Sequence, residues 1–126
     1  MEKAREKKLK CLESDYFVDG AGVRVGITWS EEHDNRWFLN LLENKFDEAV
    51  LLCQTKSDES LAVRLPKAFI NRHWHHFSRD GIGEIKFVVM RERGSFYVQL
   101  VQPVGKVDVS EYVEKDRVVA SEWEYA

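Results

Sequence analysis

Alternating apolar and polar positions predict a β-hairpin near the beginning of the chain. Val23, Val25 and Ile27 alternate with polar or small residues, which is the period of a half-buried strand. Residues 16–18 are also typical of a strand, and the DGAG sequence between the two runs is typical of a turn. We therefore expect residues 16–18 and 23–29 to pair as antiparallel strands.

The same kind of pattern predicts two further strand pairs. A continuous apolar run at residues 49–53 indicates a buried strand, and residues 61–65 form the strand that returns after a polar turn. Residues 84–90 and 96–101 indicate a second hairpin, whose apolar positions alternate on both strands. Shorter strands are expected within residues 106–113 and 117–124.

Helical spacing predicts an amphipathic helix over residues 31–45. Ser30 is a favourable N-cap, and Glu31, Glu32 and Asp34 follow it in the first turn, where the helix dipole favours negative charge. Apolar side chains then recur with a helical period, which predicts a core-facing stripe. The stripe consists of Trp37, Phe38, Leu41, Leu42 and Phe46.

A second helix is expected to begin at Pro66, because proline is favoured at the first helical position. Ile70, Trp74 and Phe77 would share its buried face, and Gly81 is a reasonable end. Residues 1–13 are rich in good helix formers and basic side chains. They predict a basic N-terminal helix or arm.

These elements predict an α+β fold with two or three helices. Its twisted antiparallel sheet would have about seven strands and could close like a barrel. We expect a single α+β domain over residues 14–126, preceded by the arm.

Length and composition are those of one globular domain. The chain has 126 residues, of which 44% are hydrophobic and 33% charged. No run approaches eighteen apolar residues, so no membrane association is expected, and the N-terminus lacks the apolar core of a secretory signal. Cys11 and Cys53 lack metal-ligand spacing and predict reduced thiols in an intracellular protein, cytoplasmic or nuclear.

Charge is distributed unevenly around a formal net charge of −3. Residues 14–60 carry a net charge of −6, whereas residues 61–93 carry +4. A basic segment of this kind can bind an anionic partner, and lysine and arginine contacts to phosphates would make nucleic-acid binding dependent on salt. The candidate nucleic-acid-binding residues are Lys56, Arg64, Lys67, Arg72, Arg79, Lys86, Arg91 and Arg93. The alternative is that these cations are solvated or pair internally with the acidic segments.

Two weaker patterns concern metal chemistry. His73 and His76 have the i, i+3 spacing of helical zinc ligands, with Asp80 as a third candidate. Glu84 and Lys86 lie two residues apart on a predicted strand, as in one family of metal-dependent nucleases. Surface histidines around a buried Trp74 explain the first pattern equally well. We assign no catalytic residue, metal or cofactor, and the question of metal at the histidines stays open.

The sequence LAVRLPKAFI at residues 61–70, together with residues 84–100, resembles the B3-type DNA-binding pseudobarrel family. That family includes plant transcription-factor domains and similar domains in some restriction endonucleases. The resemblance covers residues 49–101 and implies a seven-stranded open barrel with two short helices and two arms that enter the major groove of DNA. It would place the Lys56–Ser60 turn and Arg64 near one arm, and Arg91 and Arg93 near the other. The family's later helix motif is missing.

The leading hypothesis is a non-catalytic module that binds DNA or RNA through residues 56–93. The first alternative is an acidic protein-interaction module, such as an inhibitor, immunity or adaptor protein. It would bind a basic protein partner through residues 14–60 and 108–124. The second alternative is a metal-dependent nuclease.

Overall fold

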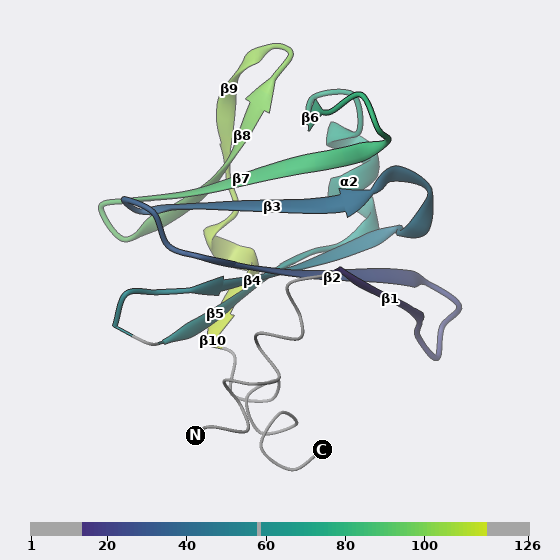
Figure 1. Ribbon diagram of the computed structural model, residues 1–126, viewed down its shortest axis with the longest axis horizontal. Helices are drawn as coiled ribbons and strands as arrows, with labels where there is room; N and C mark the ends of the chain where they lie inside the picture. The colour runs from purple at the N-terminus through teal and green to yellow at the C-terminus, as the bar shows by residue number, and fades with distance from the viewer. Residues whose placement is uncertain (1–13, 58, 116–126) are drawn as a thin grey trace.

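A computed structural model describes residues 14–57 and 59–115, without the side chain of Lys115. These residues form two β-sheets and one α-helix (Figure 1). The strands are β1 (Asp15–Val18), β2 (Arg24–Glu31), β3 (Arg36–Leu42), β4 (Glu48–Gln54), β5 (Ser60–Leu65), β6 (Ser78–Arg79), β7 (Glu84–Glu92), β8 (Ser95–Val101), β9 (Val104–Asp108) and β10 (Val113–Lys115). The helix is α2 (Lys67–His73), and η1 (Glu43–Lys45) and η2 (Ser110–Tyr112) are short 3-10 turns.

The first sheet has the strand order β1-β2-β4-β5-β10, and the second has β3-β7-β8-β9 with β6 also paired to β7. All neighbours are antiparallel except β2 and β4, which run parallel, with Ile27 opposite Val50. The chain therefore leaves the first sheet after β2, contributes β3 to the second sheet, and returns as β4. Neither sheet closes into a barrel.

The hydrophobic core lies between the two sheets, and α2 covers one of its open sides. Trp37, Leu39 and Leu41 of β3 are buried at alternating positions, as expected for a strand with one face in the core. Phe69 and Ile70 bring the helix into the same cluster. On the other face of the first sheet, a second and smaller cluster contains Val25, Val50, Leu52 and Ala62.

The predicted helix over residues 31–45 is wrong. Residues 24–31 continue as β2, a tight turn follows, and residues 36–42 form β3. Phe38 and Leu42, which were assigned to the core, have 54% and 39% of their surfaces exposed. The apolar residues within 36–42 are compatible with a helical stripe and with an alternating strand. The structure shows a strand, because β3 pairs with β7 over its whole length.

The predicted helix after Pro66 is confirmed but shorter. Pro66 is its N-cap, and the helix ends at His73, with Trp74 as its C-cap. Ile70 and Phe77 are buried as expected, whereas Trp74 is half-buried. Residues 78–79 then form β6 and not a final helical turn.

The predicted hairpins at β1–β2 and β7–β8 and the buried strands β4 and β5 are confirmed. The α+β class and the mainly antiparallel pairing are therefore right. A barrel of about seven strands with two or three helices is wrong, because the described residues form ten strands in two open sheets and one α-helix. The expected arm at residues 1–13 and strand at residues 117–124 lie outside the described residues. No helix in the described part is long and apolar enough to cross a membrane.

Candidate nucleic-acid interface

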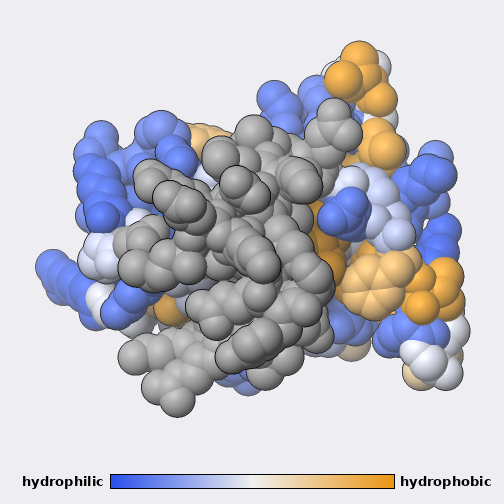
Figure 2. All heavy atoms as spheres, turned by 60° about the horizontal axis from the view of Figure 1, so that its bottom comes forward, coloured by the Kyte–Doolittle hydropathy of each residue, from blue (hydrophilic) through white to orange (hydrophobic). Residues whose placement is uncertain are grey.

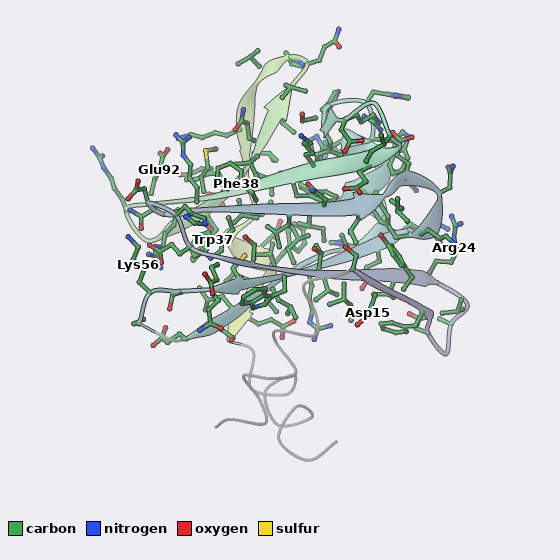
Figure 3. The ribbon with its side chains drawn as sticks, in the orientation of Figure 1. Asp15, Arg24, Trp37, Phe38, Lys56 and Glu92 are labelled. Carbon is green, nitrogen blue, oxygen red and sulfur yellow. The ribbon has the colours of Figure 1, made fainter. Side chains whose placement is uncertain are left out.

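Three connections lie together at one end of the two sheets, on the left in Figure 1. They are the β2–β3 turn (residues 32–35), the β4–β5 loop (residues 55–57 and 59) and the β7–β8 turn (residues 93–94). We call these connections, together with the adjoining strand residues Arg36, Arg91 and Glu92, the loop end. Figure 3 labels Lys56 and Glu92 on this side and Arg24 on the opposite side. Hydrophilic side chains predominate on the same left-hand side in Figure 2.

Two of these connections are turns in which two successive residues have positive φ. Asp34 and Asn35 have φ of 51° and 64°, and Arg93 and Gly94 have φ of 51° and 81°. Positive φ at both central residues is typical of the two-residue hairpin turns whose twist matches that of the strands. Asn, Asp and Gly tolerate this conformation best, so the Asp34-Asn35 pair was a sequence signal for a turn that the helix prediction overlooked.

The nearly buried carboxylate of Glu32 connects the three parts of the loop end. Its Oε1 accepts hydrogen bonds from the backbone N–H of Lys56 at 3.2 Å and from Nη2 of Arg91 at 3.1 Å. The same Nη2 also donates to Oδ1 of Asn35 at 2.8 Å. The side chain of Glu32 is only 6% exposed, and that of Arg91 is 29% exposed.

Trp37 supports this arrangement from the core side. Its indole Nε1 donates to the backbone oxygen of Gln54 at 2.9 Å, and the guanidinium of Arg91 lies 5.3 Å from its ring centroid. A cation over an indole face is attracted by the electrons of the ring. The positions of the loops relative to one another are therefore set by side chains as well as by the backbone.

The pKa of Glu32 shows which influence dominates at this carboxylate. Desolvation by burial acts to raise the pKa, but the hydrogen bonds from the Lys56 and Asn35 backbone and the nearby charge of Arg91 outweigh it. The net result is a pKa below the usual value for glutamate. Glu32 is therefore a charged structural group at neutral pH.

Three of the eight predicted binding residues lie at the loop end, but they differ in availability. Arg91 is engaged by Glu32 and Asn35. Lys56 has a side chain that is 68% exposed and 3.9 Å from the fully exposed carboxylate of Asp34. Arg93 is exposed at the tip of the β7–β8 turn. Such exposed ion pairs contribute little, so Lys56 and Arg93 are available to an outside partner.

Arg36 is a fourth cation at the loop end that the sequence analysis did not select. It is the first residue of β3 and is exposed. In the sequence analysis Arg36 belonged to the helix predicted over residues 31–45 and was not grouped with the hairpin arginines. In the structure Arg36 and Arg93 both lower the pKa of Glu92, after the larger effects of its hydrogen bond and ion pair with Lys106.

The other five predicted residues do not join this group. Arg64 pairs with Glu114 on β10, and Arg79 pairs with Glu43, lies over the ring of Trp74 and donates to two backbone oxygens. Lys67 and Arg72 are exposed on α2, and Lys86 is exposed on β7. Internal pairing, which was the alternative reading, therefore accounts for part of the basic cluster.

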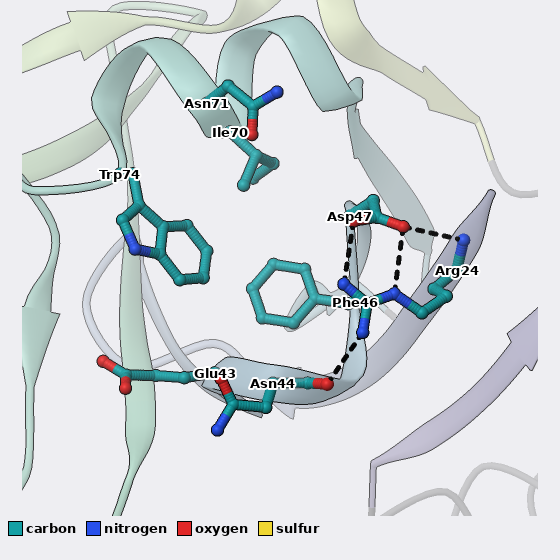
Figure 4. A pocket seen from close by; sticks show the side chains of 8 residues that line it. All are labelled: Arg24, Glu43, Asn44, Phe46, Asp47, Ile70, Asn71 and Trp74. Atoms are coloured by element: carbon teal, nitrogen blue, oxygen red, sulfur yellow. Dashed lines mark hydrogen bonds and ion pairs between the residues drawn. The ribbon is translucent and has the colours of Figure 1, made fainter.

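A pocket of about 320 Å³ lies between α2 and residues 43–47, which include η1 (Figure 4). Its lining includes Phe46 and Trp74, whose ring centroids are 5.9 Å apart. At its rim Arg24 donates two hydrogen bonds to the Asp47 carboxylate, and Nη1 of Arg24 donates to the backbone oxygen of Asn44. Arg24 and Asp47 are thus engaged with each other, and we assign this pocket no ligand.

The histidines form a hydrogen-bonded pair. Nδ1 of His73 and Nδ1 of His76 are 3.1 Å apart, so one ring donates and the other accepts. Desolvation, followed by the charges of His76 and Arg72, lowers the pKa of His73. Asp80 instead accepts hydrogen bonds from the backbone N–H groups of Ile82 and Glu84. Across the described ranges, no three His, Cys, Asp or Glu side chains are grouped so that they could hold a metal ion.

Glu84 and Lys86 lie two residues apart on β7, as the nuclease alternative requires, but Glu84 belongs to no group of three potential metal ligands among the residues described. Cys53 is a buried free thiol whose pKa is raised by burial. Cys11 lies outside the described residues. None of these groups forms a recognisable catalytic arrangement.

Comparison with models of known protein families, with curated proteins and with solved structures found no match to this chain.

Proposed function

We propose that this protein is a non-catalytic module that binds nucleic acid through the exposed cations of its loop end. The observation that supports this most directly is the attachment of the β4–β5 loop and the β7–β8 hairpin to the same carboxylate, Glu32. Two segments that are distant in sequence are thereby held side by side, and each presents a cation, Lys56 or Arg93.

The ion pairs at the loop end leave a specific set of cations available. Glu32 is neutralised by Arg91, and Glu92 by Lys106. The side chains of Arg36 and Arg93 form no ion pair with another described residue, and Lys56 has only a weak surface partner. We therefore replace the predicted set of eight residues by three: Arg36, Lys56 and Arg93. Such side chains bind phosphate oxygens and release counterions.

The resemblance to the B3-type pseudobarrel supports the proposal only in the position of its two arms, because the described residues do not form the seven-stranded barrel that it also implied. It implied two arms, one near Lys56–Ser60 and one near Arg91 and Arg93, and the corresponding loops lie at the same end of the protein. Arg64 departs from this picture, because its side chain pairs with Glu114. Membership of that family remains part of the proposal.

The test replaces three charges at the loop end and compares the result with three charges elsewhere. The first variant is R36Q/K56Q/R93Q, and the matched control is K67Q/R72Q/K86Q, which removes the same charge from α2 and β7. Glutamine keeps much of the length of the original side chain. It is unbranched at Cβ, like arginine, so it adds no strain at the positive φ of residue 93. Binding of a labelled DNA duplex, DNA single strand and RNA single strand is measured by fluorescence anisotropy over a range of salt concentrations.

We expect the loop-end variant to bind at least tenfold more weakly than wild type at low salt. For duplex DNA, the slope of log binding constant against log salt concentration should become shallower by about 0.9 for each phosphate contact that is lost. The control should stay close to wild type. Equal losses in both variants would indicate non-specific charge attraction, and a loss in the control alone would move the site to α2. No binding of any probe at low salt would refute the proposed function.

A further inference from the structure

The turn that follows α2 contains two histidines whose side chains bond to each other. His73 is the last residue of α2, and His76 lies three residues later. Their Nδ1 atoms are 3.1 Å apart, and the backbone N–H of His76 donates to the backbone oxygen of His73 at 2.8 Å. Both side chains are half-buried, whereas His75 between them is exposed. We call His73 and His76 the histidine pair.

The hydrogen bond between the two rings limits how many protons the pair can hold while the bond persists. In the neutral pair one ring donates through its Nδ1–H, and the other ring accepts through an unprotonated Nδ1. A first added proton can bind the free Nε2 of the donor ring, which leaves the bond in place. A second added proton has to bind the accepting Nδ1, because no other ring nitrogen of the pair is then unprotonated. The bond is thereby lost, and two cationic rings face each other.

Burial and like charge both oppose this second proton. Desolvation lowers the pKa of His73 most, and the nearby charges of His76 and Arg72 lower it further. The ring of His73 also lies against two apolar rings, with centroid distances of 4.7 Å to Phe69 and 6.4 Å to Phe77. Apolar neighbours do not replace the water that a cationic ring loses on burial.

The elements around the pair supply no counterion for a second positive charge. β8, which reaches His76 through a backbone hydrogen bond, contains no charged residue. Arg79 of β6 is a further cation, and its carboxylate partner is Glu43. On η2 the charge of Glu111 acts on Tyr112. Among the residues that the structure describes, no carboxylate forms an ion pair with either member of the histidine pair.

The turn that contains the pair also holds the end of β8. The backbone N–H of Val101, the last residue of β8, donates to the backbone oxygen of His76 at 2.8 Å. Beyond Val101 the chain forms the tip of the β8–β9 hairpin, where Val104 is 89% exposed. Figure 1 shows this hairpin and β6 on the same side of β7. The base of the hairpin tip is therefore attached to the backbone of one of the two histidines.

We propose that the histidine pair is a pH-sensitive switch that holds the β8–β9 hairpin in place at neutral pH and releases its tip in acid. Above the second protonation step the bond between the two rings keeps the turn closed. Below it, a second proton from the solvent breaks this bond, the two cationic rings move apart, and the backbone bond between His76 and Val101 opens with them. The switch does not depend on the proposed nucleic-acid site at the loop end.

NMR titration of the full chain from pH 8 to pH 4 follows both parts of the switch. The nitrogen signals of the two rings report which nitrogen carries each proton, and the exchange rate of the Val101 amide reports whether the hairpin is held. We expect the pair to titrate in two steps separated by about one pH unit or more, as coupled groups do. Exchange at Val101, corrected for the intrinsic effect of pH, should rise at least tenfold in the second step only.

Two variants separate the switch from the structure that carries it. His76→Gln removes one of the two rings but keeps the backbone oxygen that bonds to Val101, so we expect the Val101 amide to stay protected in acid. His75→Gln removes an exposed histidine from the same turn and should open in acid as wild type does. Circular dichroism checks that each variant is folded, and His73→Gln replaces His76→Gln if the latter is not.

Four results would overturn the proposal. The two rings could titrate independently, each in a single step. The Val101 amide could stay protected in wild type when both rings are charged. It could also open in acid in the His76→Gln variant as it does in wild type. An equal loss of protection at the buried Val98 of β8 would show that the whole protein unfolds in acid and that no local switch exists.

Discussion

Among single residues, Glu32 and Arg91 are the pair on which the loop end depends most. Arg91→Ala would leave a carboxylate that is 6% exposed without its charged partner. It would also remove the cation over Trp37. Breaking a buried pair from one side leaves an uncompensated charge, so we expect the free energy of unfolding to fall by about 2 kcal/mol in urea titrations.

The control for this prediction is Arg93→Gln, two residues further on, which should change stability by less than about 0.5 kcal/mol. Adding Glu32→Gln to the Arg91 variant should recover part of the loss, since the buried charge is then gone. An Arg91→Ala protein as stable as the Arg93 variant would contradict a structural role for Arg91.

Only some of the individual residues of the loop end could be predicted from the sequence. Lys56, Arg91 and Arg93 were identified by charge alone, because a basic cluster is visible without a fold. The role of Glu32 could not be recognised, since its partner Arg91 is 59 residues away and meets it only through the pairing of β3 with β7. A charged residue read by itself therefore does not reveal whether it is available or already paired.

At the scale of elements, the path of β2 past β3 depends on the absence of a side chain at Gly26. A Cβ at this position would lie 3.0 Å from Cδ2 of Leu41 and 3.1 Å from Cβ of Phe46. Gly26→Ala should therefore lower the free energy of unfolding by about 1–3 kcal/mol, because the buried neighbours must move. Gly105→Ala is the control, since nothing lies within 4 Å of its added Cβ. Equal stability of the two variants would show that the neighbouring side chains of β3 and η1 can move aside at little energetic cost.

Strands with strict alternation or with a continuous apolar run were predictable, as β2, β4, β5, β7 and β8 show. The helix assigned to residues 31–45 failed for a physical reason. Negative residues after Ser30 resemble a helix start, yet Asp34 and Asn35 adopt positive φ and reverse the chain. Local preference could not decide here, and the pairing of β3 with a strand more than forty residues later did.

At the scale of the whole molecule, the ion pair of Arg24 and Asp47 should affect stability in acid. The hydrogen bond from Arg24, together with its charge, lowers the pKa of Asp47 to about 2 from 3.8. A depressed carboxyl pKa stabilises the folded state above pH 3.8, and this contribution is lost as the pH falls from 3.8 to 2. The difference in unfolding free energy between wild type and Asp47→Asn should therefore disappear over this range.

Urea titrations at pH 6, 4, 3 and 2 measure this difference. The exposed Asp15, which forms no ion pair among the described residues, provides the control substitution Asp15→Asn. A gap between wild type and Asp47→Asn that is as large at pH 2 as at pH 6 would contradict the prediction.

The alternation of the chain between the two sheets has a consequence for how the protein unfolds. The chain contributes β1 and β2 to one sheet, β3 to the other, β4 and β5 to the first, β6 to β9 to the second, and β10 again to the first. Neither sheet is therefore a continuous piece of sequence. Strands of the two sheets alternate along the chain, so unfolding one sheet would also disturb the strands of the other. The two sheets therefore cannot unfold as separate cooperative units. The loop end accordingly shares the global stability of the whole sandwich.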